Sequence, residues 1–134
     1  MKKEETKKYA EQKESIKKDV EYSLQCIEND IEEGYKEMRE SYQCFFRRYA
    51  GAQYKYEVKK EYYRQLLAEI EKSTLVELQS YLMDMVSTLT QKLIEIRIDS
   101  SCVGGMPHVA AVLEFEAKQE LLEEYTEMVS DIDI

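Results

Sequence analysis

YKEMRESYQCFFRRYAGAQYKYEVKKEYY, residues 35–63, carries a tyrosine at every seventh position. These five tyrosines are Tyr35, Tyr42, Tyr49, Tyr56 and Tyr63. A spacing of seven returns a side chain to nearly the same face of an α-helix every two turns. Apolar residues extend the pattern in steps of three and four on both sides of the stretch. The sequence therefore predicts one long amphipathic helix over about residues 4–72.

The main alternative is a helix that breaks or kinks at Tyr49-Ala50-Gly51. A glycine inside a helix costs about 1 kcal/mol relative to alanine, because its backbone loses more freedom on folding. The apolar phase nevertheless continues across Gly51 and resumes at Tyr63. Both the continuous and the kinked helix are consistent with this pattern.

Two further helices are predicted after residue 72. Thr74, followed three residues later by Glu77, matches a capping box ahead of an apolar run, and this indicates a helix over 75–98. The turn formers of residues 99–106 then lead into a third helix over 108–130. A short loop favours antiparallel packing of the second and third helices. We expect an all-α single domain over 1–134, a helical bundle or coiled-coil-like protein in which a long helix accompanies a C-terminal hairpin.

The composition restricts the class of protein. Charged residues make up 35% of the chain, which has four glycines, one proline and a formal net charge of −9. This acidity opposes general binding to nucleic acid or to anionic lipid. Residues 45–64 are the exception, with six basic and two acidic residues, whereas residues 65–134 have four basic and fourteen acidic residues. A local basic site is therefore compatible with the acidic total.

Three cysteines at wide spacing, Cys26, Cys44 and Cys102, are typical of unpaired thiols in a reducing compartment. No stretch reaches the roughly 18 apolar residues that a membrane-spanning helix needs, and no apolar signal segment follows the N-terminal lysines. We expect a cytoplasmic protein without a membrane partner.

A helix over residues 4–72 would be at least twice as long as the hairpin, so part of its tyrosine-bearing seam would remain uncovered. Tyrosine is favoured at protein interfaces. We therefore expect partner binding, either to another protein or to a second copy in a homodimer or higher homo-oligomer. The alternative is that the tyrosines pack in the core. The predicted contact residues are Tyr35, Tyr42, Phe45, Tyr49, Tyr56 and Tyr63.

A second hypothesis assigns the basic aromatic block to an anionic small molecule. Aromatic rings can stack on bases, basic side chains can hold phosphates, and a glycine turn at a helix start can expose amides. The alternative is that the basic residues pair with carboxylates of the third helix and that the glycines form a plain turn. The candidate ligand-binding residues for a phosphate-bearing molecule or nucleotide are Arg47, Arg48, Lys55, Gly104, Gly105 and His108.

No set of residues in the sequence indicates an enzyme. Cys102 and His108 could form a nucleophile and base, but neither an orienting group nor an oxyanion site is identifiable. One histidine and scattered cysteines do not provide a metal site, so we expect no metal or other cofactor. The chain is similar in size and acidity to small helical inhibitor proteins from phages, an analogy that rests on no shared motif. A binding protein, such as an adaptor, an inhibitor or an assembly subunit, is the expected function.

Overall fold

The computed structural model describes residues 2–98 and 106–134, which form helices and no strands. The first helix, α1, spans Lys2–Glu40. A short helix, α2 (Tyr42–Arg48), reverses the chain direction, and α3 (Ala50–Lys72) runs back along α1. The prediction of an all-α fold is confirmed.

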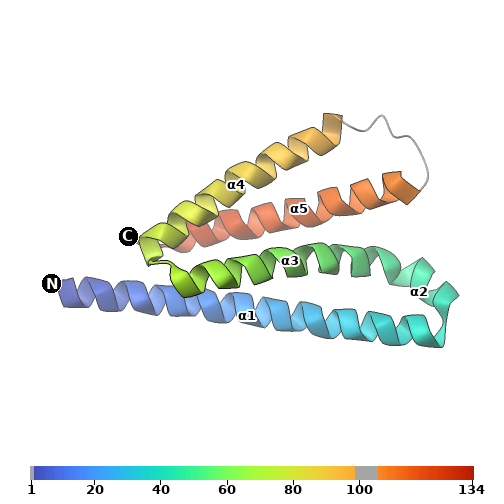
Figure 1. The fold of residues 1–134 in the computed structure, drawn as a ribbon, viewed down its shortest axis with the longest axis horizontal. Coiled ribbons are helices and arrows are strands. Elements are labelled where there is room, and N and C mark those ends of the chain that lie inside the picture. The colour runs from blue at the N-terminus through green and yellow to red at the C-terminus, as the bar shows by residue number, and fades with distance from the viewer. Residues whose placement is uncertain (1, 99–105) are drawn as a thin grey trace.

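The C-terminal part of the chain is a second hairpin. It consists of α4 (Leu75–Ile98) and α5 (Met106–Asp131), which lie antiparallel to each other (Figure 1). The predicted N-cap of α4 is present, because the Thr74 hydroxyl accepts a hydrogen bond of 3.3 Å from the backbone N–H of Glu77. The predicted ranges of both helices are close to those observed.

The continuous helix over 4–72 is wrong: the alternative break at Tyr49-Ala50-Gly51 is present, at Tyr49, and an earlier break precedes it. Helix α1 ends at Glu40, and Ser41 has extended backbone angles and caps α2 by accepting a hydrogen bond of 3.3 Å from the Cys44 N–H. A second interruption follows at Tyr49. Serine hydroxyls bond readily to nearby backbone amides and therefore compete with a continuing helix. The turn lets α1 cover the apolar face of α3, so Tyr63 is buried and Tyr56 partly buried within the chain, whereas Tyr35, Tyr42 and Tyr49 remain exposed.

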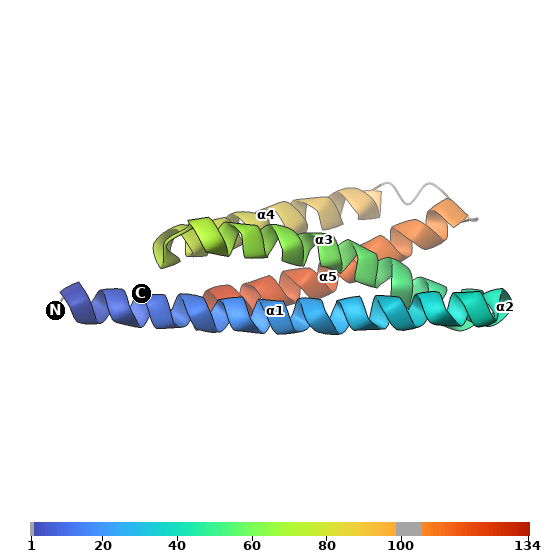
Figure 2. The same cartoon turned by 60° about the horizontal axis from the view of Figure 1, so that its bottom comes forward.

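The two hairpins pack through one shared core. Helix α5 lies parallel to α3 and antiparallel to α4, while α4 occupies an outer edge of the bundle (Figures 1 and 2). Burial of each large apolar side chain contributes roughly 1.5–3 kcal/mol. All four long helices contribute to this core, whose fully buried residues include Val20, Leu66, Ile70, Leu78, Leu82, Leu89, Leu121 and Tyr125.

The chain ends meet at the end of the bundle that is opposite to α2 (Figure 1). Lys8 forms an ion pair of 2.8 Å with Asp133, and the Gln12 side chain both donates to and accepts from the main chain of Asp133. These contacts hold the C-terminal residues against α1. Helix α2 lies at the other end of α1, far from both chain ends (Figure 1).

Candidate functional site

The five tyrosines at heptad spacing do not form one seam. Tyr35 lies on α1, Tyr42 begins α2, Tyr49 separates α2 from α3, and Tyr56 and Tyr63 lie on α3. Their exposure differs accordingly, from 3% for the Tyr63 side chain to 65% for that of Tyr42. Tyr56 is partly buried against the core. Only part of the predicted contact set is therefore available to a partner.

The most exposed aromatic residues cluster on α2. Tyr42 and Phe46, which is 50% exposed, lie one turn apart with their ring centroids 6.2 Å apart and an interplanar angle of 27°. Together with Gln43 and Arg47 they line a shallow, open hollow of about 310 Å³. Phe45 instead points inward and is buried. Phe45 is buried and α2 packs against α1 and α3, while Tyr42 and Phe46 remain exposed.

This region also differs from the rest of the chain in charge. Residues 41–56 include no aspartate or glutamate, although the whole protein carries a net charge of −9. Arg47 and Arg48 are exposed and form no ion pair within the described part of the chain. Their charges remain available to an external group. We call this surface the α2 tip and define it by Tyr42, Phe46, Arg47, Arg48 and Tyr49.

Lys55 and Lys59, two other basic residues of the block, form ion pairs within the molecule. Lys55 lies 3.0 Å from Glu120 and 3.5 Å from Glu116, and Lys59 lies 2.8 Å from Glu120. These pairs join α3 to α5. Hydrogen bonding to Glu120 raises the pKa of Lys55 above its ordinary value. Burial works to raise the pKa of Glu120, but hydrogen bonds from Lys59 and Lys55 outweigh it and leave that pKa lowered.

Tyr63 continues this polar contact into the core. Its hydroxyl donates a hydrogen bond to Glu124 of α5. Burial of the ring, followed by the hydrogen bond to Glu124, raises the pKa of Tyr63. Tyr63 therefore remains a neutral donor near neutral pH. Packing and hydrogen bonding within the bundle account for this side chain, so the predicted partner contact is not needed to explain it.

The predicted anion-binding set is not brought together within the described residues. Arg47 and Arg48 belong to the α2 tip, whereas Lys55 is committed to carboxylates of α5. Gly104 and Gly105 lie outside the described residues. His108 belongs to α5, but its side chain also lies outside the part that the structure describes. Of the predicted ligand-binding residues that the structure describes, Arg47 and Arg48 are exposed and lie beside the aromatic rings of the α2 tip.

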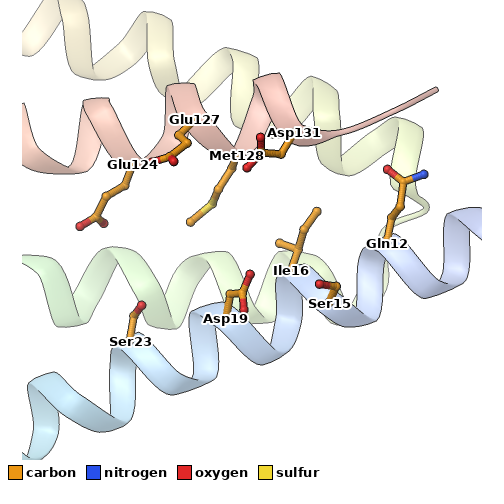
Figure 3. Close-up of a pocket in the computed structure, with 9 residues that line it drawn as sticks. All are labelled: Gln12, Ser15, Ile16, Asp19, Ser23, Glu124, Glu127, Met128 and Asp131. Atoms are coloured by element: carbon orange, nitrogen blue, oxygen red, sulfur yellow. The ribbon is translucent and has the colours of Figure 1, made fainter.

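A groove that sequence reasoning missed lies between α1 and α5 (Figure 3). Its volume is about 470 Å³, and Ile16 and Met128 supply its large apolar side chains. Carboxylates dominate its polar lining, and none of its lining residues is basic. Acidic residues on two different helices produce this concentration of negative charge. The four carboxylates are Asp19, Glu124, Glu127 and Asp131.

Two chemical properties of the described residues limit the site further. They contain no group of three histidine, cysteine or acidic side chains arranged to hold a metal ion. Within the same ranges, no helix combines the length and apolar character needed to cross a membrane.

Comparisons with known proteins give no family assignment. The chain matches no family model, and no curated protein or solved structure shows significant similarity to it.

Sequence reasoning named Tyr42 but missed its partner Phe46. A sequence signal for this pair was available. Tyr42 directly follows Ser41, a residue type that caps helices, and Phe46 lies four residues after Tyr42, one turn along the same helix. Heptad counting selected Phe45 instead, because it continued the apolar phase of the expected long helix. Once the helix restarts at Tyr42, the two neighbouring phenylalanines occupy different sides of α2.

Proposed function

We propose that the protein is a non-enzymatic binding protein that docks another protein through the α2 tip. The observation that carries the proposal is the exposed, stacked pair of Tyr42 and Phe46 beside Arg47, which forms no ion pair with the described residues. Aromatic residues and arginine are enriched at protein interfaces and often dominate binding energy. The fold supplies a rigid base for this surface, since Phe45 and the α1–α3 hairpin hold α2 in place.

The charge of the α2 tip indicates the chemistry of the partner. A segment with carboxylates would pair with Arg47 and Arg48, and an apolar side chain between those carboxylates would occupy the shallow hollow. Opposite charges would also accelerate association, although the acidic remainder of this protein opposes approach from other directions. We therefore propose an acidic protein segment with at least one large apolar residue as the partner. Binding of this kind would serve an adaptor, an assembly subunit or an inhibitor that occludes a site.

A capture experiment with two matched variants tests this proposal. The tip variant is Tyr42→Ser with Phe46→Ser, and the control is Tyr22→Ser with Val112→Ser, which removes two exposed apolar side chains elsewhere. Immobilised wild-type, tip-variant and control proteins would be incubated with the same cell lysate, and bound proteins would be quantified by mass spectrometry. We expect a protein that the wild type and the control retain and the tip variant loses. Equal capture by all three proteins would contradict the proposal.

The small-molecule hypothesis makes a different prediction. Native mass spectrometry of protein purified without denaturant would show an added mass of a few hundred daltons if a nucleotide or similar anion occupied the α2 tip. Arg47→Glu with Arg48→Glu would remove that mass. The open shape of the hollow favours a protein segment instead, because small-molecule sites usually enclose most of the ligand surface. A retained anion that depends on both arginines would replace protein docking as the function of the tip.

A further inference from the structure

The outer side of α4 is a continuous uncharged surface. A helix advances about 100° per residue, so Val76 and Ile94, eighteen residues apart, point in the same direction, and Met83 deviates from them by only about 20°. These three apolar side chains are 50%, 48% and 54% exposed, respectively. We define the α4 face by its exposed members, which are Val76, Ser80, Met83, Ser87, Thr90, Gln91 and Ile94.

This composition is unusual for the solvent side of a helix in this protein. Charged residues make up 35% of the chain, and an amphipathic helix normally carries them on the side that faces water. On α4, Glu77, Asp84 and Glu95 instead follow a neighbouring strip about 80–100° away from Val76. The α4 face itself has no charged residue over about 27 Å of helix. Helix α4 also lies at an edge of the bundle, where no other helix of the described chain covers it (Figures 1 and 2).

We propose that the α4 face binds the α4 face of a second copy of this chain. In a twofold dimer each surface patch meets the same patch of the partner, so a charged patch would oppose its own sign. Each copy carries a net charge of −9, and contact through an uncharged face keeps like charges out of the interface. A face without charges also offers no electrostatic attraction to a different, oppositely charged protein. The α4 face can thus meet its own copy without opposing like charges, and a second copy is the occupant that we propose.

The side chains of the α4 face suit close helix packing. Small residues, Ser80 and Ser87, alternate with the larger Val76 and Met83 along the face, and alternation of size allows facing side chains to interdigitate. The Thr90 hydroxyl already donates a hydrogen bond of 2.8 Å to the Val86 carbonyl oxygen. Its burial in a dimer would therefore leave no hydroxyl donor unpaired. Contact through a single helix belongs to the small class of interfaces, so we expect micromolar self-association.

This inference is independent of the proposed function because the α4 face and the α2 tip share no residue. It also replaces the predicted tyrosine seam as the surface for a homodimer. The tip variant, Tyr42→Ser with Phe46→Ser, should consequently retain the wild-type dissociation constant of the dimer. A dimer that depends on Tyr42 and Phe46 would overturn the assignment to α4.

Sedimentation velocity over a range of protein concentrations provides the test. Ser87→Glu places a carboxylate in the α4 face, while Thr88→Glu places the same charge at the next exposed position, about 100° around the same helix. We expect the wild type and Thr88→Glu to dimerise at micromolar concentrations, and Ser87→Glu to weaken dimerisation at least tenfold. Added salt should strengthen the wild-type dimer by screening the repulsion between acidic copies.

A wild type that remains monomeric at about 200 μM, well above a micromolar dissociation constant, would overturn the proposal. Equal weakening of the dimer by Ser87→Glu and Thr88→Glu would also overturn it, as would no weakening by Ser87→Glu. Circular dichroism melting establishes that each variant is folded. If Ser87→Glu does not fold, Met83→Ser removes the central apolar side chain without introducing charge. Met83→Ser should weaken the dimer, whereas removal of the exposed Tyr22 ring by Tyr22→Ser should leave it unchanged.

Discussion

The side-chain amide of Gln53 donates a hydrogen bond to the main-chain carbonyl oxygen of Ile31, 3.1 Å away across the α1–α3 hairpin. Gln53 is buried, and its side chain lies against the backbone of Gly34, where a Cβ atom would overlap Gln53 Oε1. Gly34 therefore permits a close approach of α3 to α1. The missing side chain of this helical glycine leaves the space that the Gln53 amide occupies.

This contact predicts strong coupling between positions 34 and 53. Gly34→Ala alone should lower stability or leave it unchanged, because displacement of Gln53 offsets the gain in helix propensity. In a Gln53→Ala background the clash is absent, and the same substitution should stabilise the protein by about 1 kcal/mol. Urea unfolding of the four proteins in the double-mutant cycle measures this difference. Equal effects of Gly34→Ala in both backgrounds would contradict the contact.

The cap of α2 gives a second prediction. Ser41→Ala removes the oxygen that accepts from the Cys44 N–H and should destabilise the protein by about 1 kcal/mol. Ser41→Asn retains a capping oxygen and should come close to wild-type stability. Thermal unfolding monitored by circular dichroism compares the three proteins. A continuous helix through residue 41 would predict the opposite order, because alanine has the highest helix propensity.

The ion pairs between α3 and α5 predict a pH-dependent effect. The pKa of Glu120 is lowered in the folded protein, so its contribution to stability is present above the ordinary value of 4.5 and is lost as the pH falls through the lowered pKa. Glu120→Gln should therefore reduce the free energy of unfolding by about 0.5–1 kcal/mol at pH 7. The difference from wild type should shrink below pH 4. Urea unfolding at both pH values, with the exposed Glu123→Gln as the control, tests the assignment.

The groove between α1 and α5 predicts a substitution that raises the stability of the protein. Glu127 faces a lining that includes Asp19 and Asp131 and no basic side chain (Figure 3). Glu127→Gln should relieve repulsion and stabilise the protein by about 0.5 kcal/mol at low salt. High salt should remove most of this gain by screening the charges. Glu123→Gln removes the same charge from the same helix outside the groove, and an equal gain from that variant would assign the effect to net charge alone.

Apolar periodicity was sufficient to predict the helical class and the C-terminal hairpin. The sequence signals for α4 were local and mutually consistent, since Thr74 caps the helix and leucines at steps of three and four bury one side. The reversal at Ser41 was not predictable from periodicity. Tyr42, Phe45 and Tyr49 continue the heptad phase even though the backbone changes direction between them. Side-chain phase reports which residues are buried on a helix, but it does not report that one helix has ended and another has begun.

The sequence indicated only part of the candidate site, because the pairing of charges also depends on how the helices pack. The sequence identified the basic aromatic block but did not show which of its basic side chains pair with carboxylates of the same molecule and which remain accessible. Lys55 and Lys59 meet carboxylates that lie more than 55 residues away in the sequence, and only the three-dimensional packing of α3 against α5 reveals these pairs. Arg47 and Arg48 lie on α2 instead, are exposed, and form no ion pair with the residues that the structure describes. The uncharged α4 face was likewise missed, since its serines and glutamine obscure the apolar stripe in a linear reading.

The contacts of Lys8 and Gln12 with Asp133 give the molecule two distinct poles. Both ends of the chain are anchored at one pole, and the α2 tip occupies the other (Figure 1). A tether attached at either end would therefore present the tip outward from a support. A short linker from the C-terminal residues to the start of α1, with new ends opened elsewhere, would produce a circular permutant that preserves every helix pairing. The bundle can thus be attached to a support or circularly permuted without altering the surface that we assign to binding.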